Sequence, residues 1–245
     1  MKSQYDDKEF FSAYSSVTRS RLGLEGAGEW ETVRSLMPDV SGMRILDLGC
    51  GFGWHAKWFC RQKAAKIRAI DSSLNMLEKA RQLNNDERIS YENGDIESLD
   101  FGIMQYDLVF SSLVFHYVRD YSTLIRKIQS CLKPGGCLLF SLEHPVFTAE
   151  GSEDWCYDEN GCIKHFPLDN YFREGERMTG FLGFPVRKYH RTLTTYLSVL
   201  LDSGFAVTAV REPEVPEHLK GLEEMKNEWR RPMMLVIRAE KIHTA

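Results

Sequence analysis

The chain has 245 residues, a formal net charge of -4 and an isoelectric point of about 6.0. This length fits one α/β domain with a substantial core, and the acidic balance argues against a nucleic-acid-binding surface. No apolar run is long enough to cross a bilayer, and the N-terminus lacks the apolar core of a signal peptide. We therefore expect a cytoplasmic protein that acts on neither membranes nor nucleic acids.

The cysteines show no C-x-x-C spacing, which would be typical of a zinc or redox site. They lie at positions 50, 60, 131, 137, 156 and 162. In a chain without export signals we expect reduced, buried thiols and no metal site. Cys156 and Cys162 flank a predicted turn and could in principle pair, but a disulfide is not the expectation.

Residues 1–25 combine polar and aromatic side chains, and Phe10, Phe11 and Tyr14 suit one face of a short helix. Two interpretations remain open for this segment. It either packs on the domain or forms a lid over a bound ligand, with Tyr14 and Arg19 facing that ligand. An amphipathic helix over residues 28–37 is predicted to follow.

A buried strand over residues 45–48 is predicted to enter a glycine turn, followed by a helix over residues 54–62. The glycines at positions 49, 51 and 53 permit a tight turn and close approach of a ligand to the backbone. A dinucleotide-binding fingerprint would place its third glycine at Trp54. The turn is instead G-x-G-x-G behind Asp47, at the carboxyl end of a parallel strand, where α/β proteins bind nucleotide-type ligands.

The second strand is predicted over residues 66–70 and ends at Asp71. Ser72 or Ser73 can cap the helix over residues 74–83. An acid at this strand tip, about 20 residues after the glycines, suits ribose hydroxyls, whereas the plainer alternative is a solvated acid.

A third strand over residues 89–92 leads into Asn93-Gly94-Asp95-Ile96, and a fourth over residues 106–110 ends at Ser111-Ser112-Leu113. Asp120 is a plausible N-cap for a helix to residue 132. Lys133-Pro134-Gly135-Gly136 is predicted to end that helix, before a fifth strand over residues 137–142.

This ordered set resembles the class I S-adenosylmethionine-dependent methyltransferases, of the broad small-molecule type, over residues 45–142. The set comprises D-x-G-x-G-x-G, the acid after strand two, G-D-I after strand three, Y-D-L-V, and L-K-P-G-G before strand five. The resemblance implies a Rossmann-like, mostly parallel seven-stranded sheet with helices on both faces and an antiparallel last strand. It also implies S-adenosylmethionine as cofactor, S-adenosylhomocysteine as product and a small-molecule acceptor.

Carried over by position, the glycines would touch the methionine end of the cofactor, Asp71 the ribose, and Asp95 with Ile96 the adenine. The acid beside the glycines suits the amino acid end, and Ser111 to Leu113 would line the other side. The expected cofactor-binding residues are Tyr14, Arg19, Asp47, Gly49, Gly51, Asp71, Ser72, Asp95, Ile96, Ser111, Ser112 and Leu113.

Residues 144–191 are irregular and rich in aromatic side chains, with a hairpin predicted between residues 155–157 and 163–166. We expect this insertion to cap the pocket, and the alternative is a surface excursion with its own aromatic core. A helix over residues 191–201 and strands over 205–210 and 232–239 follow. The loop over 217–231 is expected to contain a solvated helix. The whole chain, residues 1–245, is then one domain.

Methyl transfer from a sulfonium is an in-line displacement, so the protein mainly aligns the acceptor and excludes water. A base is needed only where the acceptor loses a proton. His116 and His144, which follow strands four and five, are the first candidates, against a structural role for each. Further candidates for the base are Glu143 and His190, and those for binding an anionic acceptor are Arg19, Arg187 and Arg191.

Other functions remain possible. One is a non-catalytic cofactor-binding module that regulates a partner. Another is a nicotinamide-dependent oxidoreductase, which Trp54 disfavours. A nucleic-acid methyltransferase is disfavoured by the acidic balance and by the lack of an N/D-P-P-[FYW] tetrapeptide after strand four. The acceptor atom stays open, and either a monomer or a homodimer is compatible with the sequence.

Overall fold

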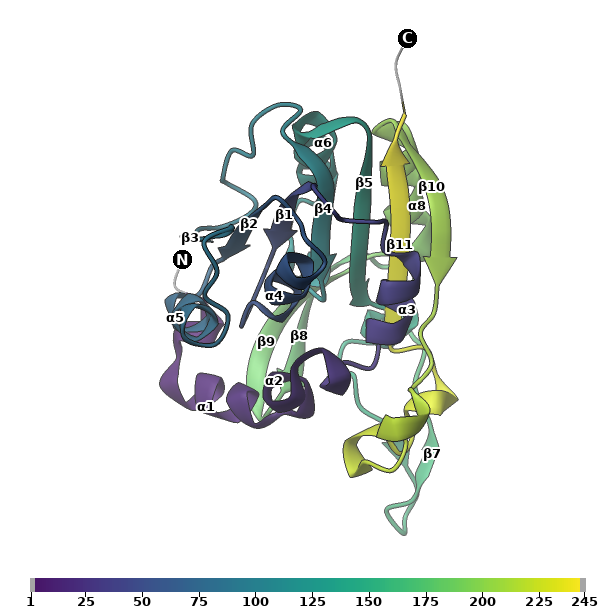
Figure 1. Cartoon of the computed structure of the whole chain (residues 1–245). Coiled ribbons are helices and arrows are strands. Elements are labelled where there is room, and N and C mark those ends of the chain that lie inside the picture. Colours follow the sequence, from purple (N-terminus) through teal and green to yellow (C-terminus); the bar gives the residue numbers. More distant parts are fainter. Residues whose placement is uncertain (1–2, 243–245) are drawn as a thin grey trace.

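The computed structural model describes residues 3–242, and one seven-stranded sheet forms its centre (Figure 1). The strands lie in the order β10-β11-β5-β4-β1-β2-β3. They are β1 Arg44–Leu48, β2 Lys66–Asp71, β3 Ile89–Asn93, β4 Tyr106–Ser112, β5 Leu132–Glu143, β10 Phe205–Arg211 and β11 Met234–Lys241. The last strand, β11, runs antiparallel to both of its neighbours, and the other pairs are parallel. The predicted Rossmann-like α/β sheet is confirmed.

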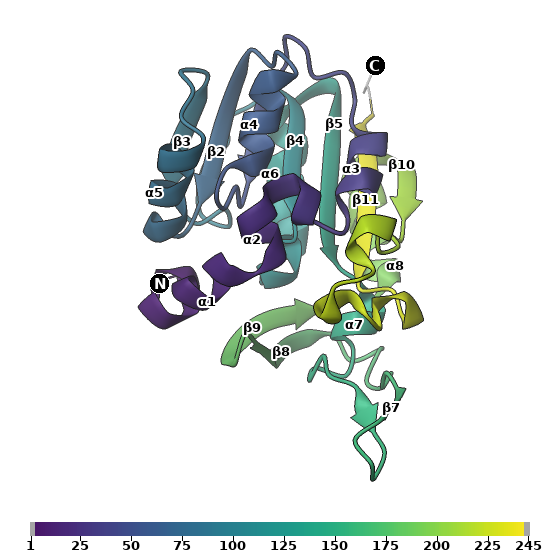
Figure 2. The same cartoon turned by 60° about the horizontal axis from the view of Figure 1, so that its bottom comes forward.

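Helices cover both faces of this sheet (Figures 1 and 2). They are α1 Lys8–Ser16, α2 Thr18–Leu22, α3 Trp30–Leu36, α4 Trp54–Arg61, α5 Leu74–Leu83, α6 Tyr121–Cys131, α7 Pro145–Thr148 and α8 Leu193–Asp202. Successive side chains of a strand point to opposite faces. Ile45 accordingly packs in the core under α3 and α4, and Leu46 in the core under α6 and α8.

Several element boundaries differ from those predicted. The Lys-Pro-Gly-Gly segment lies inside β5, where the β4–β5 register jumps between Tyr106 and Leu108 and absorbs the extra residues as an irregularity. Helix α8 begins at Leu193 because the side chain of Thr192 caps it. The prediction of a helix within residues 217–231 is wrong, because three short 3₁₀ turns form there instead.

The insertion at residues 144–191 contains two hairpins. The predicted one forms from β6 Cys156–Tyr157 and β7 Ile163–His165. A second one, β8 Gly175–Phe181 with β9 Phe184–His190, was not predicted. It lies at the end of the sheet where α1 and α2 also lie (Figures 1 and 2).

Helix α1 and the β8–β9 hairpin meet beyond the carboxyl ends of the strands. Gln4 Nε2 donates a hydrogen bond to Pro185 O at 3.1 Å. The buried ring of Phe10 packs edge-on against Phe184, with the centroids 5.5 Å apart. The first helix and the insertion therefore enclose the same edge of the sheet.

All six cysteines are free. Four are buried as expected, whereas Cys156 is half-buried and Cys162 is exposed. Among the side chains that the structure describes, no group of three or more His, Cys, Asp or Glu residues is arranged to hold a metal ion. No helix of the described chain is long and apolar enough to cross a membrane.

Candidate active site

The glycine turn links β1 to α4 through a backbone that other residues would strain. Gly49, Gly51 and Gly53 have φ of +75°, +51° and +75°, in the left-handed region. A Cβ on Gly49 would clash with Val114, and one on Gly53 with the hydroxyl of Tyr91. A Cβ on Gly51 would meet nothing within 4 Å, so the space beside its Cα is open to a ligand.

Asp71, at the tip of β2, holds the turn in place. Its Oδ2 accepts the Gly51 N–H at 2.8 Å, and its Oδ1 accepts the Ser73 N–H at 2.9 Å. Burial raises the pKa of Asp71 to about 6, against the lowering effect of those two N–H groups. Each carboxylate oxygen has a second lone pair, so Asp71 can still accept hydrogen bonds from ribose hydroxyls.

Asp47 is buried beside the turn, with 1% of its surface exposed. Burial, together with the charge of Asp71, raises the pKa of Asp47 to about 8. Its Oδ2 has no hydrogen-bond partner within residues 3–242. A buried acceptor without a partner costs free energy, and a ligand that brings an N–H or O–H group to this turn would remove that cost.

A cleft opens between the glycine turn, the end of β4 and the segment after α1. Its lining residues are Tyr14, Arg19, Ser20, Gly23, Leu24, Ala27, Gly49, Cys50, Gly51, Phe52, Trp54, His55 and Ser112. Strands β2 and β3 lie on one side of β1, and β4 and β5 on the other. The cleft therefore lies at the topological switch point, where open α/β sheets bind their ligands.

An ion pair forms one wall of the cleft. Arg19 Nη2 lies 2.7 Å from Oε1 of the buried Glu29, which also accepts the Ser112 hydroxyl at 3.0 Å. Burial raises the pKa of Glu29, but the charge of Arg19 outweighs it and lowers the pKa overall. Both residues are therefore charged at neutral pH, and Arg19 still faces the cleft.

Glu29 and His55 were not predicted as residues of the site. Glu29 gave no signal, because an acid at the start of a helix usually faces solvent. His55 had one, since it follows the glycine turn directly. Its ring packs against Trp30 and Phe110, and burial lowers its pKa to about 3, so that the imidazole is neutral.

The remaining expected cofactor residues have mixed placements. Ser111 donates its hydroxyl to Leu48 O at 2.8 Å, which occupies that side chain in the sheet. The Leu113 N–H donates to Ser141 O at 2.9 Å. Ser72 is exposed, and it is Ser73 that caps α5. These three residues do not line the cleft.

Asp95 and Ile96 lie in the loop after β3, also outside the cleft lining. Asp95 is exposed, and its Oδ1 accepts the Glu97 N–H at 2.9 Å, whereas Ile96 is buried. Of the predicted set, Tyr14, Arg19, Gly49, Gly51 and Ser112 come together around the cleft.

The hydrogen bonds of His116 leave it no lone pair for catalysis. Its Nδ1 accepts the Glu143 N–H at 3.2 Å, so the neutral ring carries its proton on Nε2, 3.8 Å from Glu143 Oε1. Burial lowers its pKa to about 4, which keeps the ring neutral.

The other two candidate histidines are occupied in the same way. Nδ1 of His144 accepts the Val146 N–H at 3.0 Å, and Nε2 lies 3.0 Å from Glu212 Oε1. His190 Nε2 donates to Tyr171 O, so its Nδ1 accepts from the Thr148 hydroxyl, both at 2.8 Å. A general base needs a free lone pair, and this geometry therefore does not support either His116 or His144 as the base.

The candidate arginines beyond Arg19 are also occupied. Arg191 is buried, and its Nη2 donates to the carbonyls of Val118 and Arg119 at 2.7 and 2.8 Å. Arg187 is exposed on β9, 3.4 Å from Glu176. Neither presents a free guanidinium to the cleft.

A mostly parallel sheet with an open glycine turn at its switch point defines a Rossmann-like cofactor-binding enzyme. Comparison with known proteins shows which family within this class the chain resembles. A family model described as a methyltransferase domain matches residues 46–140. A solved S-adenosylmethionine-dependent methyltransferase from Mesorhizobium loti is 40% identical with a TM-score of 0.82, and the match covers 89% of this chain and 100% of that one. A proposed S-adenosylmethionine-dependent methyltransferase from Listeria monocytogenes is 44% identical with a TM-score of 0.86, over 90% and 100% of the two chains.

Two further proteins are similar to this chain in sequence. An uncharacterized protein from Haemophilus influenzae is 32% identical over 98% of this chain and 97% of its own length. A malonyl-[acyl-carrier protein] O-methyltransferase from Priestia megaterium is 40% identical over 98 residues, but the match spans only 40% of this chain and 35% of that protein. Its substrate therefore does not transfer to this chain by similarity.

The chain belongs to the class I S-adenosylmethionine-dependent methyltransferase family. The expectations of an enzyme and of S-adenosylmethionine as its cofactor are confirmed, and the regulatory-module and oxidoreductase alternatives are set aside. The residues of the cleft fit this cofactor. Arg19 suits its carboxylate, and the open space beside Gly51 suits a polar amino acid end, with the unpartnered oxygen of Asp47 buried behind the glycines.

Proposed function

We propose that this enzyme transfers the methyl group of S-adenosylmethionine to a small-molecule acceptor by in-line displacement. The observation that supports this most directly is the polar cleft at the switch point, bounded by Gly49, Gly51, Arg19 and Ser112. The bound cofactor supplies an activated methyl group, so the task left to the protein is to orient the acceptor and exclude water.

In this proposal each end of the cofactor has its own residues. Gly49, Gly51, Tyr14 and Arg19 surround the methionine end, and Asp47 lies behind the glycines. Asp71 accepts the ribose hydroxyls with its free lone pairs.

In the loops after β3 and β2, we propose that Asp95 and Ile96 flank the adenine and that Ser72 lies beside the ribose. Along β4, the Ser112 side chain lines the cofactor cleft, while Ser111 and Leu113 support it through their bonds to Leu48 and Ser141.

We further propose one domain over residues 1–245, of which residues 1–2 and 243–245 lie outside the described part of the chain, and in which two segments close the site. Residues 1–25 act as a lid and residues 144–191 as a cap. The contact of Phe10 with Phe184 and the hydrogen bond from Gln4 to Pro185 support this arrangement, because they join the two segments across the carboxyl ends of the strands. A closed site strengthens the electrostatic interactions within it and keeps water from the sulfonium.

Calorimetric titration with S-adenosylmethionine, S-adenosylhomocysteine and NAD tests the cofactor site. The first two should bind, and Arg19→Gln should weaken both. The exposed Arg187→Gln is the matched control and should bind them normally. Binding of NAD alone, or equal affinities of the Arg19 variant and the control, would refute the proposed site.

A further inference from the structure

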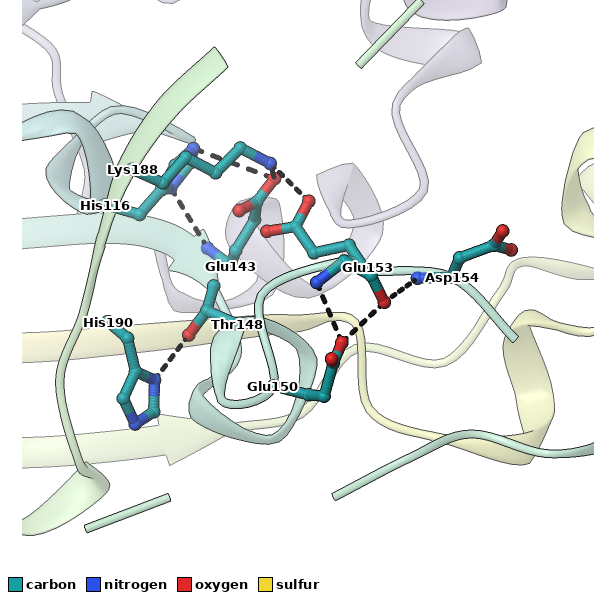
Figure 3. Close-up of polar contacts among 9 residues, drawn as sticks. His116, Glu143, Thr148, Glu150, Glu153, Asp154, Lys188 and His190 are labelled. Atoms are coloured by element: carbon teal, nitrogen blue, oxygen red, sulfur yellow. Dashed lines mark hydrogen bonds and ion pairs between the residues drawn. The ribbon is translucent and has the colours of Figure 1, made fainter. Parts of the chain in front are cut away.

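A buried lysine joins the insertion to the end of the sheet (Figure 3). Lys188, on β9, is 1% exposed, and its Nζ lies 2.6 Å from Glu143 Oε1 and 2.6 Å from Glu153 Oε2. Glu143 is the last residue of β5, and Glu153 lies in the loop after α7. Three side chains from three separate segments thus share one desolvated site.

This cluster lies directly outward from the cofactor cleft. Ser141 pairs with Ser112, which lines the cleft, and their hydroxyls are 3.3 Å apart. Residues two apart on a strand share a face and are separated by about 7 Å. Glu143 therefore follows Ser141 on the same face, one step beyond the cofactor, where an acceptor enclosed by the insertion would lie.

The cluster holds one positive charge and two carboxyl groups. Burial, followed by the charge of Glu143, raises the pKa of Glu153 to about 8, so Glu153 keeps a proton at neutral pH. Burial also raises the pKa of Glu143, but His116 and Lys188 outweigh it and lower the pKa overall. Glu143 is therefore the ionised member of the pair.

The two carboxyl groups share one proton. Glu143 Oε2 and Glu153 Oε1 are buried and have no partner outside the pair among the described residues. Because Glu153 Oε2 faces Lys188, the proton of Glu153 lies on Oε1 and is donated to Glu143, which helps to lower the pKa of Glu143.

Of the nearby cations, Lys188 is neutralised by the pair itself and Arg19 by Glu29, whereas Arg191 donates from Nη2 to two carbonyls and its Nη1 has no partner among the described residues. An acceptor that carries a carboxylate would be repelled by the ionised Glu143, whereas one that carries an O–H or N–H group could donate to a second lone pair of the Glu143 carboxylate.

We propose that Glu143 takes the proton of the methyl acceptor and that the acceptor reacts through a hydroxyl or amine. In this proposal Lys188 and Glu153 position the carboxylate of Glu143. As the acceptor atom forms its bond to the methyl carbon, the carbon–sulfur bond breaks and the sulfur keeps the electron pair. The acceptor proton passes to Glu143, and the positive charge of the sulfonium is neutralised. This inference rests on the proposed function and names the acceptor class of the same site.

Titration of the glutamate carboxyls by NMR, with ¹³C-labelled glutamate, tests the pair without any acceptor. The wild-type protein should show one carboxyl that titrates near pH 8. That signal should vanish in Glu153→Gln and remain in Glu150→Gln, a matched change at a carboxylate that accepts hydrogen bonds from Ser152. If every glutamate titrates below about pH 6, the shared proton does not exist and the inference fails.

Turnover tests the catalytic assignment. We would measure release of S-adenosylhomocysteine with matched aromatic compounds that bear a phenol, an alkyl hydroxyl, an amine or a carboxylate. Methylation should occur on the hydroxyl or amine compounds, and Glu143→Gln should lower kcat about 100-fold or more. Lys188→Met should move the acidic limb of the pH–rate profile to higher pH, and Lys188→Arg should restore it in part.

The controls separate this inference from the proposed function. Glu143→Gln should bind S-adenosylmethionine within about threefold of wild type, because Glu143 does not line the cofactor cleft. Full turnover by Glu143→Gln, or methylation of a carboxylate, would overturn the acceptor assignment alone. Absence of cofactor binding in the wild-type protein would instead refute the proposed function.

Discussion

Replacement of Asp71 by alanine tests whether the glycine turn and the ribose depend on one carboxylate. In the structure this carboxylate accepts the N–H groups of Gly51 and Ser73. In the proposed complex it also accepts two ribose hydroxyls. A hydrogen bond to a charged group contributes about 1.5–3 kcal/mol. The lower value for each hydroxyl gives about 3 kcal/mol, or a roughly 150-fold rise in Kd.

The assay is calorimetric titration with S-adenosylhomocysteine, paired with urea unfolding. Asp107→Ala is the matched control, because Asp107 also accepts a backbone N–H, from Arg44 at 2.8 Å. Asp107 lies at the start of β4, at the end of the parallel strands opposite to Asp71 and the cleft. Both variants should lose stability, and only Asp71→Ala should lose affinity. The wild-type affinity should also fall as the pH drops through about 6, where Asp71 gains a proton. Equal affinities in a folded Asp71→Ala protein would refute the ribose assignment.

Three further variants test the packing and the buried charges. Gly53→Ala should lower the free energy of unfolding by more than Gly42→Ala does. Both glycines have φ near +75°, but only at position 53 would the new Cβ clash with Tyr91. Urea midpoints measure the difference, and equal losses of stability would contradict a contribution from the clash. For Glu153, the folded pKa of about 8 lies above the value near 4.5 of the unfolded chain, so its contribution is present below pH 4.5 and is lost as the pH rises to 8. Urea unfolding from pH 5 to 9 should therefore show a steeper loss of stability, by a few kcal/mol, in wild type than in Glu153→Gln, and parallel curves would contradict the raised pKa. Arg191→Met should lower the free energy of unfolding by about 2–4 kcal/mol, because the two buried carbonyls that Arg191 binds would lose their donor. Thermal unfolding measures this loss, and the exposed Arg187→Met should show almost no change.

The first half of the sheet could be predicted because its signals are local. The apolar strand at residues 45–48, the glycine turn and the cap at Asp120 each depend on neighbours in the sequence. Asp120 does cap α6, through its bond from the Thr123 N–H at 2.9 Å. Asp71 was placed correctly at the tip of β2 for the same reason.

The β8–β9 hairpin gave no such signal. Its turn residues, Leu182 and Gly183, have φ of +55° and +82°, values typical of a two-residue type I′ turn. That turn usually has Asn or Asp where this chain has Leu182. Contacts with Phe10, far away in the sequence, compensate for the unfavourable residue.

The sequence offered several candidates for the base and could not rank them by geometry, because lone pairs cannot be counted from a sequence. His116 lost its free nitrogen to the Glu143 N–H, 27 residues away, and His144 is occupied by its own helix and by Glu212. The partner that singles out Glu143 is Lys188, 45 residues further along the chain. Only the fold brings these groups together.

An ion pair holds each of the two segments that lie outside the central sheet. Arg19, from α2, pairs with Glu29, and Lys188, from β9, pairs with Glu143. A buried ion pair adds little net stability, but separating its partners costs about 3–5 kcal/mol. Each segment therefore has one favourable position over the cleft, since a displaced one would leave a charge unpaired in a dry site. In the proposed closed site the same charges also affect which acceptor binds, because the ionised Glu143 would repel a carboxylate and can accept a hydrogen bond from an O–H or N–H group.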